Sequence, residues 1–172
     1  MSDSAGAPGG DNGEVDLRRA HPEDGLEIAE LWLRSRRASV PAIPPAVHTD
    51  EEVRTWFREV VLPHREVWVA EAGGTVIALL VLDEEWVDQL YVAPDWTSKG
   101  VGSRLLDVAK QHRPTGLKLW TFQANAGARR FYERNGFVGI ATTEGDNEEG
   151  APDVLYQWDA GASTRPARRF SS

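Results

Sequence analysis

The first third of the chain carries apolar side chains at helical spacing in two segments. The first begins at the acidic turn Pro22–Asp24, which suits the positive end of a helix dipole, and ends before Pro41. The second begins at Thr49, with Glu52 three residues later as the partner of a capping box, and is stopped by Pro63. We therefore predict two helices joined by a proline-rich, extended connection.

The middle of the chain changes to the spacing of strands. Over 66–71, Val67 and Val69 alternate with Trp68 and Ala70, and a mostly apolar segment follows at 75–82. Gly73-Gly74 separates the two segments and is typical of a hairpin turn. A third segment, 86–92, ends at a proline. These segments predict three consecutive antiparallel strands.

Helices and strands then alternate to the end of the chain. The predicted elements are a helix at about 98–112, a strand at 117–122, a helix at 125–135 closed by Gly136, and strands at 137–142 and 154–158. Their order is two helices, three strands, a helix, a strand, a helix and two strands. It predicts an α/β (α+β) domain with a mostly antiparallel sheet, one parallel βαβ crossover in its middle, and helices on both faces.

The two ends of the chain differ from this pattern. Residues 1–13 hold too few apolar groups to order themselves, and we expect a disordered N-terminal tail. Residues 160–172 are small or basic, and we expect a flexible basic C-terminal tail. One domain is left at 14–159.

Composition narrows the possible functions. The 172 residues carry a formal charge of −8, which does not suit sequence-independent binding of nucleic acid. The absence of cysteine excludes disulfides, thiolate metal sites and a cysteine nucleophile, and fits a cytoplasmic protein. The longest apolar run, Val76–Leu82, is too short to span a membrane, and the four histidines lack metal-ligand spacing. We expect no nucleic acid, membrane or metal partner; a homodimer is left open.

A strand that runs into a glycine-rich helix start is the first candidate site. Gly100 and Gly102 let the backbone approach a ligand closely, and Lys99 adds a mobile positive charge. The free N–H groups of a helix N-terminus can bind a pyrophosphate. By itself the pair of glycines also fits a plain helix start.

The second candidate site lies one strand–helix unit later. Asn125 stands between a strand and a helix, where its amide can cap the helix or bind a ligand. Ala128 and Tyr132 are four residues apart and share one helix face. Taken singly, Asn125 is better explained as a helix cap and Tyr132 as a half-buried core tyrosine.

Together the two segments resemble the GCN5-related N-acetyltransferase (GNAT) superfamily. The first family motif is matched by Gly100-Val101-Gly102, and the second by Asn125, Ala128, Tyr132 and Gly136-Phe137. The resemblance covers about residues 15–159. It implies a six- to seven-stranded sheet with a splayed central parallel pair, and transfer of an acetyl group from acetyl-CoA to an amine. Thr97 stands where the family usually has Arg or Gln, which predicts weaker or differently tuned binding of CoA.

The resemblance also implies roles for individual residues. Backbone at positions 90–92 would hold the thioester and the pantetheine arm, and backbone at 98–103 the pyrophosphate. The residues implied for acetyl-CoA are Leu90, Tyr91, Val92, Thr97, Ser98, Lys99, Gly100, Val101, Gly102, Ser103, Asn125, Ala128, Tyr132 and Arg134.

The same resemblance implies direct attack within a ternary complex. Tyr132 would act as general acid toward the departing thiolate, because a phenol stays protonated at neutral pH. The amine must lose a proton, and among the carboxylates leading into the central strand we predict Glu85 or Asp88 as the base. A second acidic group precedes the last strand and favours a cationic acceptor; its members are Glu144, Asp146, Glu148, Glu149 and Asp153.

Three alternatives remain at this stage. The chain could be a degenerate GNAT module that binds acyl-CoA or a protein without turnover, which Thr97 favours and intact Asn125 and Tyr132 oppose. Within enzymes, the acyl donor could be longer, or the acceptor could be an oxygen.

Overall fold

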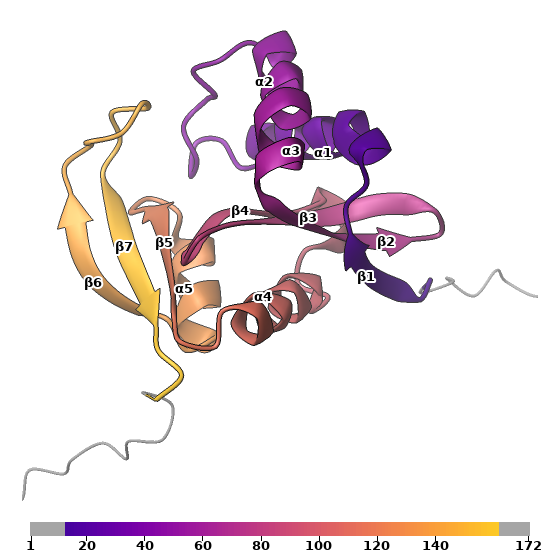
Figure 1. Ribbon diagram of the computed structural model, residues 1–172. Helices are drawn as coiled ribbons and strands as arrows, with labels where there is room; N and C mark the ends of the chain where they lie inside the picture. Colours follow the sequence, from indigo (N-terminus) through magenta and orange to yellow (C-terminus); the bar gives the residue numbers. More distant parts are fainter. Residues whose placement is uncertain (1–12, 162–172) are drawn as a thin grey trace, which may run out of the picture.

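The computed structural model describes residues 13–161 and contains a seven-stranded sheet of order β1-β2-β3-β4-β5-β7-β6 (Figure 1). Only β4 and β5 are parallel neighbours; every other neighbouring pair is antiparallel. The strands are β1 (Val15–Arg19), β2 (Glu66–Ala72), β3 (Thr75–Asp83), β4 (Trp86–Val92), β5 (Leu117–Phe122), β6 (Val138–Thr143) and β7 (Asp153–Trp158). The mixed sheet with one parallel crossover is as predicted.

Helices cover both faces of the sheet, again as predicted (Figure 1). On one face lie α1 (Gly25–Ala38), α2 (Asp50–Trp56), a π-helical turn (Phe57–Val61) and α3 (Leu62–His64). On the other lie α4 (Val101–His112) and α5 (Ala126–Arg134). Each face has its own apolar core, and β3 contributes to both, because its side chains alternate between them.

Two sequence predictions were wrong in detail. The predicted order omitted β1, whose two apolar residues were too weak a pattern; β1 is an edge strand that Arg18 fixes through Asp24 and Glu71. Pro63 does not end the second helix either. The wider π turn before it leaves Pro63 at the start of a further turn, where its missing N–H is not needed, and the helix continues to His64.

The predicted tails fall largely beyond what the structure describes. Of residues 1–13 it includes only Gly13, and of 160–172 only Ala160 and Gly161. The domain limits of 14–159 and both tails therefore stay predictions.

Candidate active site

The centre of the sheet opens between its two parallel strands. Trp86 of β4 pairs with Lys118 of β5, and within residues 13–161 the register of the two strands contains no further pair. Beyond this point β5 gives the described backbone of β4 no ladder partner, and the carbonyl of Val92 accepts a hydrogen bond from the Ser35 hydroxyl at 3.3 Å instead. The splay that the GNAT resemblance implied is therefore present, and it exposes backbone N–H and C=O groups near the middle of the domain.

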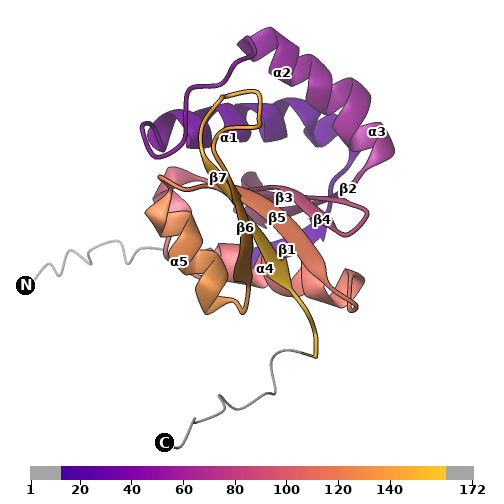
Figure 2. The same ribbon diagram turned by 90° about the vertical axis from the view of Figure 1, so that its left-hand side faces the viewer.

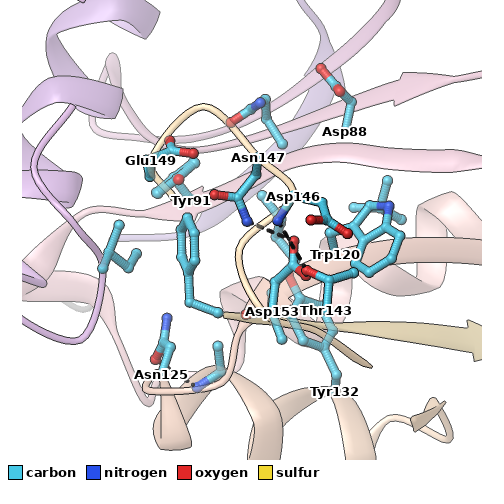
Figure 3. Close-up of a pocket in the computed structure, with 17 residues that line it drawn as sticks. Asp88, Tyr91, Trp120, Asn125, Tyr132, Thr143, Asp146, Asn147, Glu149 and Asp153 are labelled. Atoms are coloured by element: carbon cyan, nitrogen blue, oxygen red, sulfur yellow. Dashed lines mark hydrogen bonds between the residues drawn. The ribbon is translucent and has the colours of Figure 1, made fainter. Parts of the chain in front are cut away.

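A cavity of about 570 Å³ occupies this opening (Figure 3). Its walls come from β4, the end of β5, α5 with the residue before it, and the β6–β7 loop with the adjoining ends of both strands; the loop after α1 adds one residue. It is lined by Ile43, Val87, Asp88, Gln89, Leu90, Tyr91, Trp120, Thr121, Phe122, Asn125, Ala128, Tyr132, Thr143, Asp146, Asn147, Glu149 and Asp153. The described wall of the cavity therefore contains β4 and the second candidate segment, whereas no residue of the glycine-rich turn 97–103 lines it.

The turn before α4 has an unusual backbone. Ser98 and Gly100 both have positive φ, 62° and 82°, and no side chain caps the helix that follows. The first N–H groups of α4 are therefore free to bind an anion. Thr97 donates its hydroxyl to the carbonyl of Pro94 at 3.0 Å, so it closes the turn from within.

Helix packing explains why position 102 is a glycine. A Cβ atom there would lie 3.0 Å from the ring of Phe131 on α5. The glycine thus lets α4 pack closely against α5, in addition to any role beside a ligand. A Cβ at Gly100, in contrast, would meet no atom within 4 Å.

The α5 segment places its three motif residues in the cavity wall. The Asn125 side chain accepts a hydrogen bond from the N–H of Ala128 at 3.1 Å and so caps the helix. Tyr132 is 9% exposed, and its hydroxyl makes no hydrogen bond to any group within residues 13–161. Burial, together with nearby Tyr91, raises the pKa of the Tyr132 phenol, which keeps it protonated at neutral pH.

Not every predicted residue reaches the cavity. Glu85 is exposed in the turn between β3 and β4, and its contacts give no support to a role as base. Arg134 is exposed on α5 and does not line the cavity. Asp88 does line it, in an ion pair with Arg65; burial raises the pKa of Asp88, against the opposing effect of Arg65.

Arg36 organises the wall on the α1 side, and sequence reasoning missed it. Its guanidinium contacts Glu149 at 3.2 Å, the hydroxyl of Tyr91 at 3.3 Å and the carbonyl of Pro44 at 3.1 Å, and it lies over the ring of Trp32. Burial raises the pKa of Tyr91, although Arg36 opposes the shift. The buried stripe of α1 does include position 36, a signal that could have identified this arginine.

The loop between β6 and β7 rises to α1 and the loop after it (Figure 2). Besides Glu149, it is held by Glu148, which contacts His48 at 3.1 Å. Of the acidic group predicted on the acceptor side, Asp146, Glu149 and Asp153 line the cavity, whereas Glu144 and Glu148 do not.

Two further features of residues 13–161 concern membranes and metals. These residues contain no helix long and apolar enough to cross a membrane. They also contain no group of three or more side chains suited to holding a metal ion.

Comparison with known proteins agrees with this geometry. Residues 63–139 match the family model of the acetyltransferase (GNAT) domain. The chain is 28% identical over 135 residues to peptidyl-lysine N-acetyltransferase YjaB of Salmonella typhimurium, covering 77% of this chain and 90% of YjaB. It is 27% identical over 143 residues to peptidyl-lysine N-acetyltransferase YiaC of Escherichia coli, covering 83% and 95%.

A solved structure gives the same result. The solution structure of apo YjaB from Escherichia coli superposes with a TM-score of 0.68 at 25% identity, covering 84% of this chain and 97% of that one. Motifs, splayed strands and relatives lead to one conclusion: the chain carries the acetyltransferase (GNAT) domain match at residues 63–139 and is an N-acetyltransferase that transfers an acetyl group from acetyl-CoA to an amine.

Proposed function

We propose that the acceptor is a lysine side chain or a similar primary amine, presented by a peptide or small cationic molecule, and that Tyr132 is the general acid. The observation that carries this proposal is the Tyr132 side chain, which is 9% exposed, has a raised pKa that keeps the phenol protonated, and lies in the wall of the cavity between β4 and β5; its hydroxyl makes no hydrogen bond within residues 13–161. The relatives YjaB and YiaC, both named peptidyl-lysine N-acetyltransferases, support the choice of amine.

The donor side is built mainly from backbone. The free N–H groups at the start of α4, after the positive-φ residues Ser98 and Gly100, would bind the pyrophosphate of acetyl-CoA. The pantetheine arm would follow the open edge of β4 past Leu90 and Val92 into the cavity. There the unpaired amides of β4 suit the oxyanion that forms when the amine attacks.

In this mechanism Tyr132 has one role, which is to donate a proton. As the tetrahedral intermediate collapses, the carbon–sulfur bond breaks and the phenol gives its proton to the thiolate. A phenol that burial keeps neutral is in the correct state for this step. Its ring is fixed by edge contacts with Phe131 and Phe137, so the hydroxyl is held in place before substrate arrives.

Charge on the acceptor side favours a cation. Within residues 13–161, no Lys or Arg lines the cavity, whereas four carboxylates do: Asp88, Asp146, Glu149 and Asp153. Trp120, 46% exposed, adds an aromatic face beside them (Figure 3). An ammonium group would be stabilised by charge attraction to the carboxylates and by a cation–π contact with the indole.

The test is acetylation of a peptide that has one lysine and a blocked N-terminus. With acetyl-CoA, the native protein is expected to release CoA thiol and to place the acetyl group on the lysine Nε, as located by mass spectrometry. Binding of acetyl-CoA without transfer to any amine would contradict the proposal and favour the acyl-CoA-binding module. Transfer to a hydroxyl of a serine peptide instead would make the acceptor an oxygen.

A further inference from the structure

The four carboxylates in the cavity wall differ in what balances their charge. Glu149 is paired with Arg36 at 3.2 Å, and Asp88 is paired with Arg65. Asp146 is exposed at the rim, where water screens it. Asp153 is only 7% exposed and makes no ion pair with any residue in 13–161. It is therefore the one buried carboxylate of this wall that the described chain leaves without a cation.

Neutral donors hold the Asp153 side chain in a fixed position. One oxygen accepts the hydroxyl proton of Thr143, and the other accepts the side-chain amide of Asn147 at 3.0 Å (Figure 3). The backbone carbonyl of Asp153 accepts a further hydrogen bond from Gln123 at 3.2 Å. A carboxylate can accept about four hydrogen bonds, so two acceptor positions remain for a ligand.

The position of Asp153 relative to the reacting groups also fits. It begins β7 and pairs with Phe122 at the end of β5, on the far side of the opening from β4. Tyr132 lies in the wall of the same cavity. An amine entering beneath the β6–β7 loop would meet Asp153 before reaching a thioester held along β4.

We infer that Asp153 is a catalytic residue: it binds the acceptor ammonium and removes its first proton, a role that rests on the function proposed above. A buried carboxylate without a cation is costly, and a substrate ammonium supplies the missing charge. Neither Glu85, outside the cavity, nor Asp88, paired with Arg65, is as well placed.

The proton balance of the step is complete. The ammonium gives one proton to Asp153, which passes it to water, and the neutral amine then attacks the thioester carbon. As the carbon–nitrogen bond forms and the carbon–sulfur bond breaks, Tyr132 protonates the sulfur and is re-protonated by the second N–H proton. The third proton stays on the amide, so acetyl-CoA and ammonium give amide, CoA thiol and one released proton.

The experiment compares two acceptor peptides whose amines differ in pKa and therefore in how strongly their deprotonation depends on a general base. One peptide carries lysine and the other 5,5-difluorolysine, whose fluorines withdraw electrons, lower the pKa of the ε-amine and leave more of it neutral. Asp153→Asn keeps the size of the side chain and can still bond Thr143 and Asn147. We expect it to lower kcat/KM for the lysine peptide by about 10²–10³-fold and for the difluorolysine peptide by less than about 10-fold.

Two controls separate this role from a structural one. Asp146→Asn removes a carboxylate of the same cavity and should lower kcat/KM for both peptides equally and only slightly. Asn147→Ala keeps the Asp153 carboxylate but removes one of the two donors that hold it, so its loss should be smaller than that of Asp153→Asn and should still be larger for the lysine peptide. Thermal unfolding of each variant checks that the fold is kept.

The outcomes distinguish the inference from the function beneath it. An equal loss with both peptides for Asp153→Asn, or no loss, would overturn the catalytic role while the native enzyme still acetylated both. Failure of the native enzyme to acetylate either peptide would overturn the proposed function and the role of Asp153 with it.

Discussion

The donor side and the acceptor side of the cavity are built in different ways. The donor side comes from two contiguous segments, and what it offers acetyl-CoA is mostly backbone: the free end of α4 and the open edge of β4. The acceptor side is made of side chains from α1, the loop after it, β4 and the β6–β7 loop, held by ion pairs such as Arg36–Glu149. The donor is thus recognised by local conformation, and the acceptor by contacts between distant segments.

The two sides should therefore differ in how they respond to substitution. A backbone site needs only small residues and correct turns, so different sequences can keep it. A side-chain site changes with each substitution in any of its four segments. Variants of the two sides should therefore affect different measurements.

The largest effect is expected where the two sides meet. Tyr132→Phe removes only the acidic proton and keeps the ring contacts, so kcat should fall by about 10³-fold with the acetyl-CoA Kd unchanged. Steady-state thiol release and calorimetry measure the two quantities. The control is Tyr156→Phe on β7, which removes a hydroxyl that donates a hydrogen bond to Glu133 of α5. This variant should leave kcat close to the native value. A large rise in Kd for Tyr132→Phe would make the residue structural.

On the acceptor side, Arg36→Met should cost about 3 kcal/mol of folding stability. The change leaves Glu149, 18% exposed, without its cation, while the methionine still packs on Trp32. Chemical denaturation measures the loss. The neighbouring Arg37→Met breaks only an exposed pair with Asp50 and should cost less than about 1 kcal/mol. Equal losses would show that the pair beneath the β6–β7 loop has no special role.

On the donor side, Gly100→Val should weaken acetyl-CoA binding about tenfold. A β-branched residue is strained at the φ of +82° that Gly100 adopts, although it would meet no atom there. Gly73→Val imposes a similar strain at φ +57° in the β2–β3 turn, far from the site. Calorimetry should find a raised Kd only for the first variant; unchanged affinity in both would count against the phosphate-binding turn.

The smallest effect is expected at the exposed contacts of His48 beside the β6–β7 loop. His48 contacts Glu148 and Glu52 with half of its side chain exposed, so the pairs are screened. His48→Gln should change stability by less than about 1 kcal/mol and leave kcat/KM for the lysine peptide near the native value. A tenfold loss of kcat/KM would mean that the contacts of His48, rather than those of Arg36, hold the β6–β7 loop in position.

The same contrast explains what could be predicted from the sequence. The turn at Gly100 and the cap at Asn125 were found because their chemistry lies within short segments. Arg36 was missed, and Glu85 was chosen as a candidate base, because charges far apart in sequence are brought together only by folding. In the fold, β1 was missed because its pairing with β2 rather than its own pattern defines it.

Calorimetric titration of the native protein with acetyl-CoA, beside CoA and NADH, tests the central claim most directly. We predict micromolar binding of acetyl-CoA and CoA, because both carry the pyrophosphate and the pantetheine arm, and no comparable binding of NADH, which lacks the arm. Equal binding of all three would mean that the turn before α4 recognises only a pyrophosphate. No binding of acetyl-CoA would contradict the assignment of the cavity.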